Sequence, residues 1–263
     1  MKDLKKIGRG GYGAVYSASL GREKVAVKML SDDALSTGFD QEVSLMAQCS
    51  SIYIAQIKGA CYSPPSCCII MELMQQDLKT YLQKWKFQKD GSPIKIRYQI
   101  ACDIACGIEY LHEKGILHND VKSPNVLLDG SLRGKVTDFG ASRKKVSESV
   151  SVGAGGLVGT VCWMAPEVER GGGCGRFSDM FSVGMVLWEL VSFETPFVKM
   201  TPLEYLNMVN HGEKREHIPV STPFAPVPPM YFEMINECWR VDPTKRPSAT
   251  RLVDELLKEF STL

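Results

Sequence analysis

The sequence predicts an α+β protein of two lobes, a small β-rich lobe with one helix followed by a larger, mainly helical lobe. Two observations predict this arrangement. Apolar residues recur mostly with the spacing of strands up to residue 74 and mostly with the spacing of helices beyond it. Where the pattern changes, the polar stretch at residues 72–76 is suited to a connector between lobes. We therefore assign residues 1–74 to the first lobe and residues 75–263 to the second.

Strands account for most of the first lobe. Two strand pairs are predicted, each around a turn containing Gly or Pro: residues 14–20 with 25–29, and residues 57–62 with 67–71. Between the pairs, Phe39, Val43 and Met46 fall at i, i+4 and i+7, the spacing of one apolar helix face. The first lobe should therefore be a small sheet with one helix.

Helices account for most of the second lobe. Isoleucines spaced by four predict a long helix that ends near residue 112: Ile96, Ile100, Ile104 and Ile108. Further helices are predicted over residues 177–191, 203–209, 230–239 and 248–260. The last should begin after Ser248, a preferred N-cap residue. Short β-type runs lie at residues 126–128 and 135–137.

Composition excludes several classes of protein. The chain of 263 residues is 44% hydrophobic, so it can bury a core without disulfides. A formal charge of +1 disfavours nucleic acid or an anionic membrane as a partner, and the longest apolar stretch, residues 180–193, is too short to span a bilayer. Nine scattered cysteines without a C-x-x-C pair suggest reduced thiols, so we expect a cytoplasmic location.

A glycine-rich segment opens the chain. Gly8, Gly10, Gly13 and Val15 match G-x-G-x-x-G-x-V, although a glycine-rich turn without a ligand would be the commoner explanation of this motif alone. A dinucleotide fold needs a helix after the glycines, whereas here a strand follows. The loop should therefore form the tip of a hairpin, where backbone N–H groups can approach phosphate oxygens. Only seven residues precede Gly8, so the first strand should be short.

Lys28 and Glu42 suggest an ion pair. A lysine at the end of an apolar strand is ordinarily a solvated edge residue, and a helical glutamate is ordinarily exposed. If residues 25–28 are buried, however, the ammonium of Lys28 needs an anion. Glu42 is the only glutamate before the next strand, and a pair between the two would hold the lysine in place.

Four polar residues carry the chemistry: Asp120, Lys122, Asn125 and Asp138. Phosphoryl transfer needs a group to orient the attacking hydroxyl, a cation near the moving phosphoryl group and oxygen ligands for magnesium. Asp120 could accept the hydroxyl's proton, Lys122 could supply the cation, and the other two offer oxygens to a hard cation. Each residue alone would be read as a turn or cap residue. Together, downstream of the glycine loop and Lys28, they would rarely occur by chance.

From about residue 4 to about residue 260, the sequence resembles the eukaryotic protein kinase family, with many motifs in family order. The matching positions are the glycine loop, Lys28, Glu42, Asp120, Lys122, Asn125, Asp138-Phe139-Gly140, Ala165-Pro166-Glu167, Asp179 and Arg246. The resemblance implies a bilobal protein-kinase-like fold that uses ATP with Mg²⁺ or, alternatively, Mn²⁺. It also places Met71 at the gatekeeper, the backbone of Glu72 and Met74 at the adenine-reading hinge, and Ala26 and Leu127 on either side of the base.

The resemblance implies a full set of site residues. The expected catalytic residues are Asp120, Lys122, Lys28, Glu42 and Thr160, and the expected metal ligands are Asn125 and Asp138. The expected cofactor-binding residues are Ile7, Gly8, Arg9, Gly10, Gly11, Tyr12, Gly13, Ala14, Val15, Ala26, Lys28, Met71, Glu72, Met74 and Leu127.

The hydroxyl that is phosphorylated can also be inferred from the resemblance. Lys122 lies two residues after Asp120, as in serine/threonine kinases, and Thr160 matches the threonine that in the family bonds the catalytic aspartate and lysine. The segments KSPN and WMAPE look like the tyrosine-kinase-like group. We therefore expect an ATP-dependent protein serine/threonine kinase in intracellular signalling. Its partners should be ATP and a protein with a Ser or Thr acceptor, without nucleic acid or membrane insertion; the oligomeric state stays open.

Two alternatives remain, a pseudokinase scaffold that binds nucleotide without efficient transfer and a tyrosine or dual-specificity kinase. The family usually has H-R-D where this chain has Asn119 between His118 and Asp120. Arginine there receives an activation-loop phosphate in other members, and asparagine cannot form so strong a charged pair. We therefore predict that phosphorylation of the nearby hydroxyls is not the main on-switch: Ser147, Ser149, Ser151 and Thr160.

Overall fold

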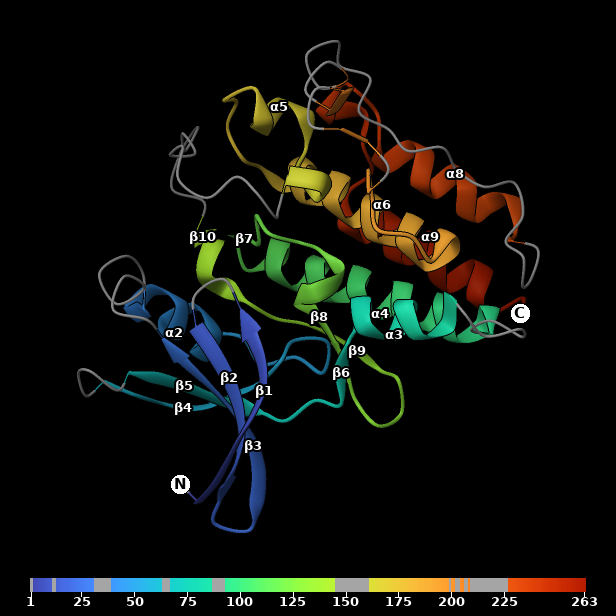
Figure 1. Ribbon diagram of the computed structural model, residues 1–263. Coiled ribbons are helices and arrows are strands. Elements are labelled where there is room, and N and C mark those ends of the chain that lie inside the picture. Colours follow the sequence, from blue (N-terminus) through green and yellow to red (C-terminus); the bar gives the residue numbers. More distant parts are fainter. Residues whose placement is uncertain are drawn as a thin grey trace.

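A computed structural model shows the two lobes expected from the sequence. It describes residues 2–10, 13–30, 39–62, 67–86, 93–144, 161–198, 200–201, 204–205, 208 and 227–263. Figure 1 shows strands β1–β5 and helix α2 in one lobe and mainly helices in the other. The prediction of a bilobal kinase-like fold, with a small β-rich lobe and a larger helical one, is confirmed.

In its described residues, the smaller lobe is an antiparallel sheet with strand order β1-β2-β3-β5-β4 and one helix, α2 (Phe39–Ala47). Its strands are β1 (Lys2–Gly10), β2 (Gly13–Leu20), β3 (Glu23–Leu30), β4 (Ile57–Cys61) and β5 (Cys68–Glu72). Both predicted strand pairs are present, β2 with β3 and β4 with β5. The expectation of a short β1 is wrong, because its pairing with β2 continues through the glycine segment until Gly10 faces Gly13.

Strand β3 is buried on both faces, and the alternation of its side chains decides where Lys28 lies. Val25 and Val27 pack on one face of the sheet with Ala18, whereas Ala26 belongs to the main core on the other face. Successive strand residues point to opposite faces, so Lys28 shares the face of Ala26. Lys28 therefore projects toward α2 and the larger lobe.

Gly13 begins β2 where this strand passes closest to β3. A Cβ atom built on Gly13 would lie 1.8 Å from the carbonyl oxygen of Met29, and Gly13 has φ of 153°. No other residue fits without displacing the backbone of β3. The third glycine of the motif is thus required by the packing of the hairpin, independently of any ligand.

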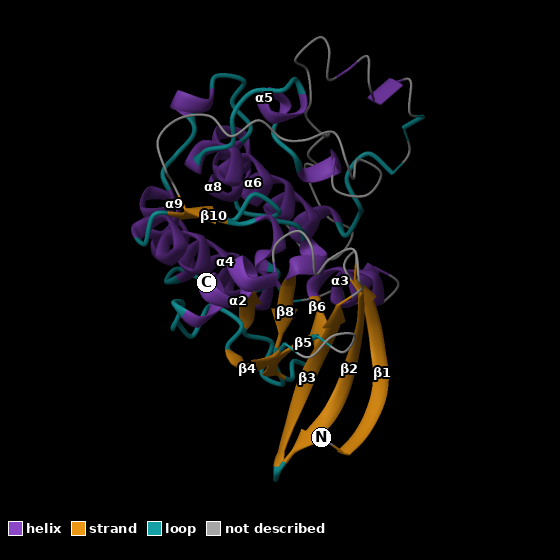
Figure 2. Cartoon of the chain, turned by 90° about the vertical axis from the view of Figure 1, so that its left-hand side faces the viewer, coloured by secondary structure: helices purple, strands orange, loops and turns teal. Residues whose placement is uncertain are grey.

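The larger lobe consists of helices with short strands between them, as Figure 2 shows in purple and orange. The helices are α3 (Leu78–Lys86), α4 (Ile94–Glu113), α5 (Pro166–Glu169), α6 (Arg176–Ser192), α8 (Pro229–Cys238) and α9 (Ala249–Phe260). The short strands are β6 (Gln76–Asp77), β7 (Ile116–Leu117), β8 (Val126–Leu128), β9 (Gly134–Val136) and β10 (Arg143–Lys144). The described part of this lobe also contains the 3₁₀ turns η1 (Ser123–Asn125), η2 (Phe139–Ala141), η3 (Val161–Trp163) and η4 (Pro243–Lys245).

Helix α6 is the centre of this lobe. It is buried along almost its whole length and packs against α4 and α8. A Cβ atom on Gly184 would lie 2.6 Å from Cβ of Cys238, so a glycine in mid-helix lets α8 approach closely. The polar side chains of α6 are therefore held inside the protein, where each needs a hydrogen-bond partner.

Most of the predicted helices are present with small shifts of their ends. Ser248 caps α9 as predicted, because its side chain accepts a hydrogen bond from the backbone N–H of Arg251. Helix α3 was not predicted, although Leu78, Tyr81 and Leu82 show helical spacing. The helix expected at residues 203–209 lies almost wholly outside the described residues. In the described part of the chain, no helix has both the length and the apolar character needed to cross a membrane.

Candidate active site

Lys28 lies between two carboxylates that come from different lobes. Its Nζ is 2.7 Å from Oε1 of Glu42 on α2 and 3.0 Å from Oδ1 of Asp138, which follows β9 in the larger lobe. Lys28 is 8% exposed and Glu42 is 5% exposed. The ion pair between Lys28 and Glu42 that the sequence suggested is present, and Asp138 extends it across the junction of the lobes.

Burial and charge compete at these three groups. Burial lowers the pKa of Lys28, but attraction by Asp138 and Glu42 outweighs burial and leaves the pKa raised. Burial, with a smaller contribution from Asp138, raises the pKa of Glu42 against the opposing effect of Lys28. At Asp138 the effect of burial is overcome by Lys28, so the pKa of this carboxyl ends below its usual value. The pKa of Asp138 is thus shifted in favour of its charged form, the form that a ligand of a hard cation needs.

The loop at residues 118–125 brings three predicted site residues together. Lys122 Nζ is 2.7 Å from Oδ2 of Asp120, and Nδ2 of Asn125 donates to the same oxygen at 2.9 Å. The turn η1 directs Asn125 back toward Asp120, because Nδ2 also donates to the backbone oxygen of Asp120 at 2.9 Å. The other carboxylate oxygen, Oδ1 of Asp120, is buried and receives no hydrogen bond from the described residues. A donor such as a substrate hydroxyl would satisfy it.

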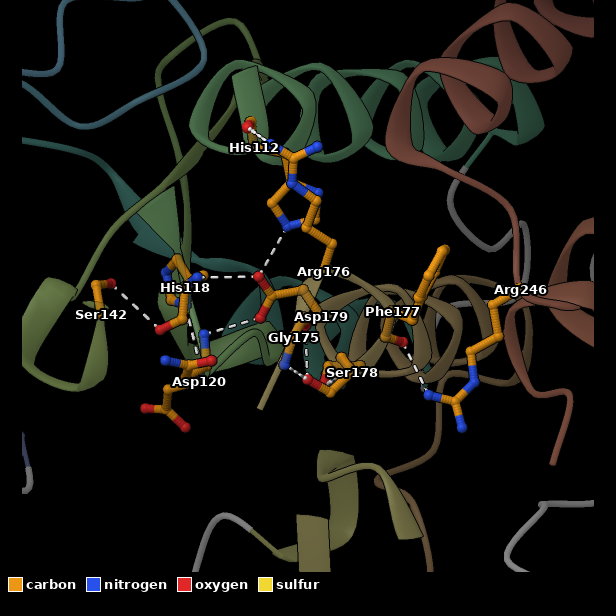
Figure 3. Close-up of polar contacts among 12 residues, drawn as sticks. His112, His118, Asp120, Ser142, Gly175, Arg176, Phe177, Ser178, Asp179 and Arg246 are labelled. Carbon is orange, nitrogen blue, oxygen red and sulfur yellow. Dashed lines mark hydrogen bonds and ion pairs between the residues drawn. The ribbon is translucent and has the colours of Figure 1, made fainter. Parts of the chain in front are cut away.

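Asp179 on α6 fixes the start of this loop, as Figure 3 shows. Its Oδ1 accepts a hydrogen bond from the backbone N–H of Asn119 at 2.8 Å, and its Oδ2 accepts one from that of His118 at 2.9 Å. Nε2 of His112 lies 2.9 Å from the same Oδ2. Asp179 is one of the positions that match the kinase family, but no feature of the sequence predicted that His112 would lie next to it.

Asn119 has left-handed backbone geometry, with φ of 62°, a conformation that asparagine adopts more readily than most residues. Its Nδ2 donates to the carbonyl oxygen of Ala141 at 3.2 Å, and Ser142 Oγ donates to the carbonyl oxygen of His118 at 3.2 Å. Beyond them, β10 pairs with β7. Among the described residues, the start of the segment after Asp138-Phe139-Gly140 is therefore held by contacts with the loop at residues 118–119 and with β7.

A second ion pair, between buried Arg246 and half-buried Glu167, lies away from these groups. Arg246 binds both carboxylate oxygens of Glu167, at 2.6 and 2.8 Å. The guanidinium also donates to the backbone oxygens of Phe177 at 2.8 Å and Arg240 at 2.9 Å, and it lies over the ring of Phe181. The segment that begins at Ala165 is thereby attached to the end of the larger lobe.

The residues expected around the adenine base lie on β1, β2, β3, β5 and β8, except Met74, which lies between β5 and β6. Ala26 and Met71 are buried in the main core, and Val15 packs against it. Leu127 and Met74 are half-buried, and Ile7 on β1 is 50% exposed. Their contact with a nucleotide stays a prediction.

Glu72 has a side-chain role that the sequence did not indicate. Both of its carboxylate oxygens lie 2.8 Å from Nζ of Lys135 on β9, and the backbone N–H of Gln56 donates to Oε1 at 2.8 Å. The carboxylate thus connects the end of β5 to the larger lobe. Only the backbone of Glu72 is left to serve the hinge role expected from the resemblance.

The oxygen donors fit a magnesium ion that arrives with phosphate groups. Lys28 contacts one carboxylate oxygen of Asp138, so the other oxygen can bind a metal ion. Asn125 donates to Asp120 through its amide nitrogen, so its amide oxygen can also bind a metal ion. Mg²⁺ is ordinarily held by one or two carboxylates together with substrate phosphates. Within the described residues, no group of three or more His, Cys, Asp or Glu side chains could hold a metal ion. Phosphate oxygens of the substrate would therefore have to complete the metal site.

Several expected site residues lie outside the described residues: Gly11, Tyr12 and Thr160, together with Ser147, Ser149 and Ser151. For Arg9 and Gly10 the backbone alone is described. Gly8, Gly13 and Ala14 flank the tip of the β1–β2 hairpin, which is where the sequence predicted the glycine loop.

Comparison with known proteins decides the family. Residues 1–256 match the family model for "Protein tyrosine and serine/threonine kinase". The chain belongs to this protein kinase family. The prediction of a kinase domain similar to the tyrosine-kinase-like group is confirmed.

The kinase is similar to proteins from plants and amoebae. It is 35% identical to the serine/threonine-protein kinase STY46 of Arabidopsis thaliana, over 97% of this chain and 44% of that protein. It is 35% identical to the serine/threonine/tyrosine-protein kinase HT1 of the same plant, over 97% and 66% of the two chains. With the dual specificity protein kinase shkD of Dictyostelium discoideum, it shares 34% identity over 95% and 33%. The kinase thus spans less than two thirds of each of these relatives.

Proposed function

We propose that the chain is the catalytic domain of an ATP-dependent protein serine/threonine kinase. The observation that carries the proposal is the convergence of Lys28, Asp138 and Asp120 at the junction of the lobes. Lys28 contacts Asp138 across 110 residues of sequence, Asp138 lies within the electrostatic influence of Lys122, and Lys122 contacts Asp120. A continuous run of alternating charges therefore joins the two lobes.

The larger lobe would provide the groups at the reacting hydroxyl. Asp120 would orient a serine or threonine hydroxyl and accept its proton at Oδ1, the oxygen that has no donor among the described residues. The hydroxyl oxygen forms a bond to the γ-phosphorus as the bond to the leaving ADP oxygen breaks. Lys122, held on Oδ2 of Asp120, places a cation beside the charge that develops on the transferring group.

The other groups would hold the nucleotide. When bound, ATP with Mg²⁺ supplies the transferable phosphoryl group and a charge that offsets the phosphates. Lys28 would bind the α- and β-phosphates, with Glu42 holding its ammonium in place. Asn125 and Asp138 would hold the metal through the oxygens left by their protein contacts.

The names of relatives favour one further candidate, a dual-specificity kinase. One similar protein is named as a serine/threonine/tyrosine kinase and another as a dual specificity kinase. Phosphoamino-acid analysis of a phosphorylated substrate separates the candidates. Phosphoserine and phosphothreonine alone support the first proposal, whereas phosphotyrosine in the same product supports the second.

We also propose a cytoplasmic setting and a protein substrate. All nine cysteines are free thiols in the structure, as expected in a reducing compartment. A formal charge of +1 gives no global attraction to nucleic acid.

A transfer assay with the purified chain, a generic basic protein and labelled ATP tests the proposed activity. Wild-type protein should label the substrate, and Asp138→Asn, which replaces the charged metal ligand, should remove the label. A wild-type chain that binds nucleotide without transferring label would instead be a pseudokinase scaffold, and the proposal would be wrong.

A further inference from the structure

Three of the nine cysteines lie at one end of the β4–β5 hairpin: Cys61, Cys67 and Cys68. Cys61 is the last residue of β4 and Cys68 is the first residue of β5, and the two are direct partners in the antiparallel register. Figure 1 shows the two strands side by side in the smaller lobe. The proposed phosphoryl transfer uses none of these thiols.

The register brings the side chains of Cys61 and Cys68 within reach of a disulfide. Residues that face each other in an antiparallel pair project from the same face of the sheet, with Cα atoms about 4.5 or 5.5 Å apart and Cβ atoms about 4.5–5.5 Å apart. A disulfide joins Cα atoms about 4.4–6.8 Å apart and Cβ atoms about 3.5–4.5 Å apart, so the Cβ atoms must approach by about 1 Å. Because β4 is an edge strand and Cys61 is its last residue, this approach moves only a strand end.

The two thiols differ in their access to solvent. Cys61 is exposed, whereas Cys68 is 2% exposed and packs against β2 and β3 on the sheet face away from α2. Burial raises the pKa of Cys68, a negative charge on Cys61 raises it further, and a hydrogen bond with the Cys61 backbone opposes both effects. The thiolate is the nucleophilic form of cysteine. An oxidant that arrives from solvent therefore reacts first at Cys61, and Cys68 lies opposite it as the second thiol.

We propose that Cys61 and Cys68 are an oxidisable thiol pair, which a hydroperoxide converts to a reversible disulfide across the β4–β5 hairpin. In a reducing compartment such as the one proposed above, a disulfide of this kind is transient and forms in response to an oxidant. The inference does not rest on the proposed kinase activity, because Cys68 lies on the sheet face opposite to that of Lys28.

The oxidation takes place in two steps. The Cys61 thiolate attacks one oxygen of hydrogen peroxide, the O–O bond breaks, and a sulfenic acid on Cys61 and one water molecule form. The sulfur of Cys68 then forms a bond to the sulfur of Cys61, the S–O bond breaks, and a second water molecule leaves. Overall, the two thiols lose two protons and two electrons to the peroxide. Dithiothreitol reverses the reaction by thiol–disulfide exchange.

Peptide mapping of the whole chain after treatment with hydrogen peroxide tests the inference. The remaining thiols are blocked with N-ethylmaleimide, and chymotrypsin then cleaves after Tyr62, which separates Cys61 from the other two cysteines. We expect the peptides that carry Cys61 and Cys68 to stay joined in most molecules after peroxide and to separate after dithiothreitol. A Cys61 that stays reduced, or that carries only sulfenic, sulfinic or sulfonic acid, overturns the inference.

Three variants identify the partner thiol. Cys61→Ser should abolish the joined peptides, and so should Cys68→Val, which keeps an apolar side chain in the buried position. Cys67→Ala is the matched control, since Cys67 adjoins Cys68, and it should form as much disulfide as the wild type. Loss of the link in Cys67→Ala, or its retention in Cys68→Val, overturns the inference.

Two further readouts complete the test. A non-reducing gel detects a disulfide between two chains, and a dimer joined through Cys61 in place of the link within one chain overturns the inference. If a variant does not fold, tandem mass spectrometry of the joined wild-type peptides assigns the partner directly. Fragments that place the link on Cys68 support the inference, and fragments that place it on Cys67 overturn it.

Discussion

Replacing Lys28 with methionine should destabilise the folded protein as well as abolish transfer. Lys28 is the cation shared by Glu42 and Asp138, and removing one partner from a buried ion pair costs about 3–5 kcal/mol because the remaining charge stays desolvated. Single domains unfold with free energies of about 5–15 kcal/mol, so the loss is a large fraction of the total. Urea denaturation of the nucleotide-free protein, followed by tryptophan fluorescence, measures it.

The double variant Lys28→Met/Glu42→Gln is the matched control. It removes one of the two carboxylates left without a cation, so it should recover part of the stability lost in Lys28→Met. The pH dependence has a defined sign. Burial already raises the pKa of Glu42, and loss of Lys28 removes the main influence that lowers it. The folded single variant should therefore bind protons that the unfolded chain does not, and its deficit relative to wild type should shrink as pH falls from 7.5 toward 5. A single variant within about 1 kcal/mol of wild type at pH 7.5 would refute this reasoning.

Three further outcomes are expected. Arg246→Met should lower the free energy of unfolding by about 2 kcal/mol in the same urea assay, because it removes hydrogen bonds to a half-buried carboxylate. Arg246→Lys should restore little of this loss, since lysine cannot bind both oxygens of Glu167. Burial raises the pKa of Glu189 to about 8 from its ordinary value of 4.5, so this group should lower the free energy of unfolding of the wild type by up to about 1.4 kcal/mol per pH unit between pH 5 and 8. Urea titrations at each pH should show a smaller decrease with pH for Glu189→Gln, which lacks this group. The same decrease in both proteins would contradict the prediction. Asn119 cannot form a strong charged pair with a phosphate, and its amide instead donates to Ala141, so transfer activity should be retained when three serines are replaced together by alanine: Ser147, Ser149 and Ser151. Abolished activity in a folded protein would contradict this.

Where the sequence predicted the site correctly, local pattern was enough. Alternation along residues 25–28 places Lys28 on the face of Ala26, and Glu42 was the only glutamate available before the next strand. The sequence suggested an ion pair between Lys28 and Glu42 on the condition that the strand is buried, and the structure contains that pair. The catalytic role of the pair stays a prediction.

Where the sequence was insufficient, the partners lie far apart along the chain. The carboxylate of Glu72 is turned toward Lys135, 63 residues away, and nothing local signals that pairing. Glu189 sits in an apolar run that indicated only a buried helix, and its partners Ser123 and Trp163 come from two separate segments. The contacts of Glu189 depend on the position of α6 among the other helices, and hydrophobic periodicity does not predict that position.

The extent of β1 was mispredicted for a different reason. The sequence predicted a short β1 because only seven residues precede Gly8. Glycine also weakens a strand in general. In the structure the hairpin continues until Gly10 faces Gly13, and Gly13 is required there because β3 leaves no room for a Cβ atom. Packing between strands thus overrode the local propensity.

The single-turnover rate of phosphoryl transfer in Asp120→Asn, compared with wild type at saturating ATP, tests the central claim most directly. Asparagine keeps the shape of Asp120 but cannot take the hydroxyl's proton, so the rate should fall by about 10²- to 10⁴-fold while ATP affinity is preserved. An Asp120→Asn variant that transfers phosphate at the wild-type rate would show that the chemistry takes place elsewhere.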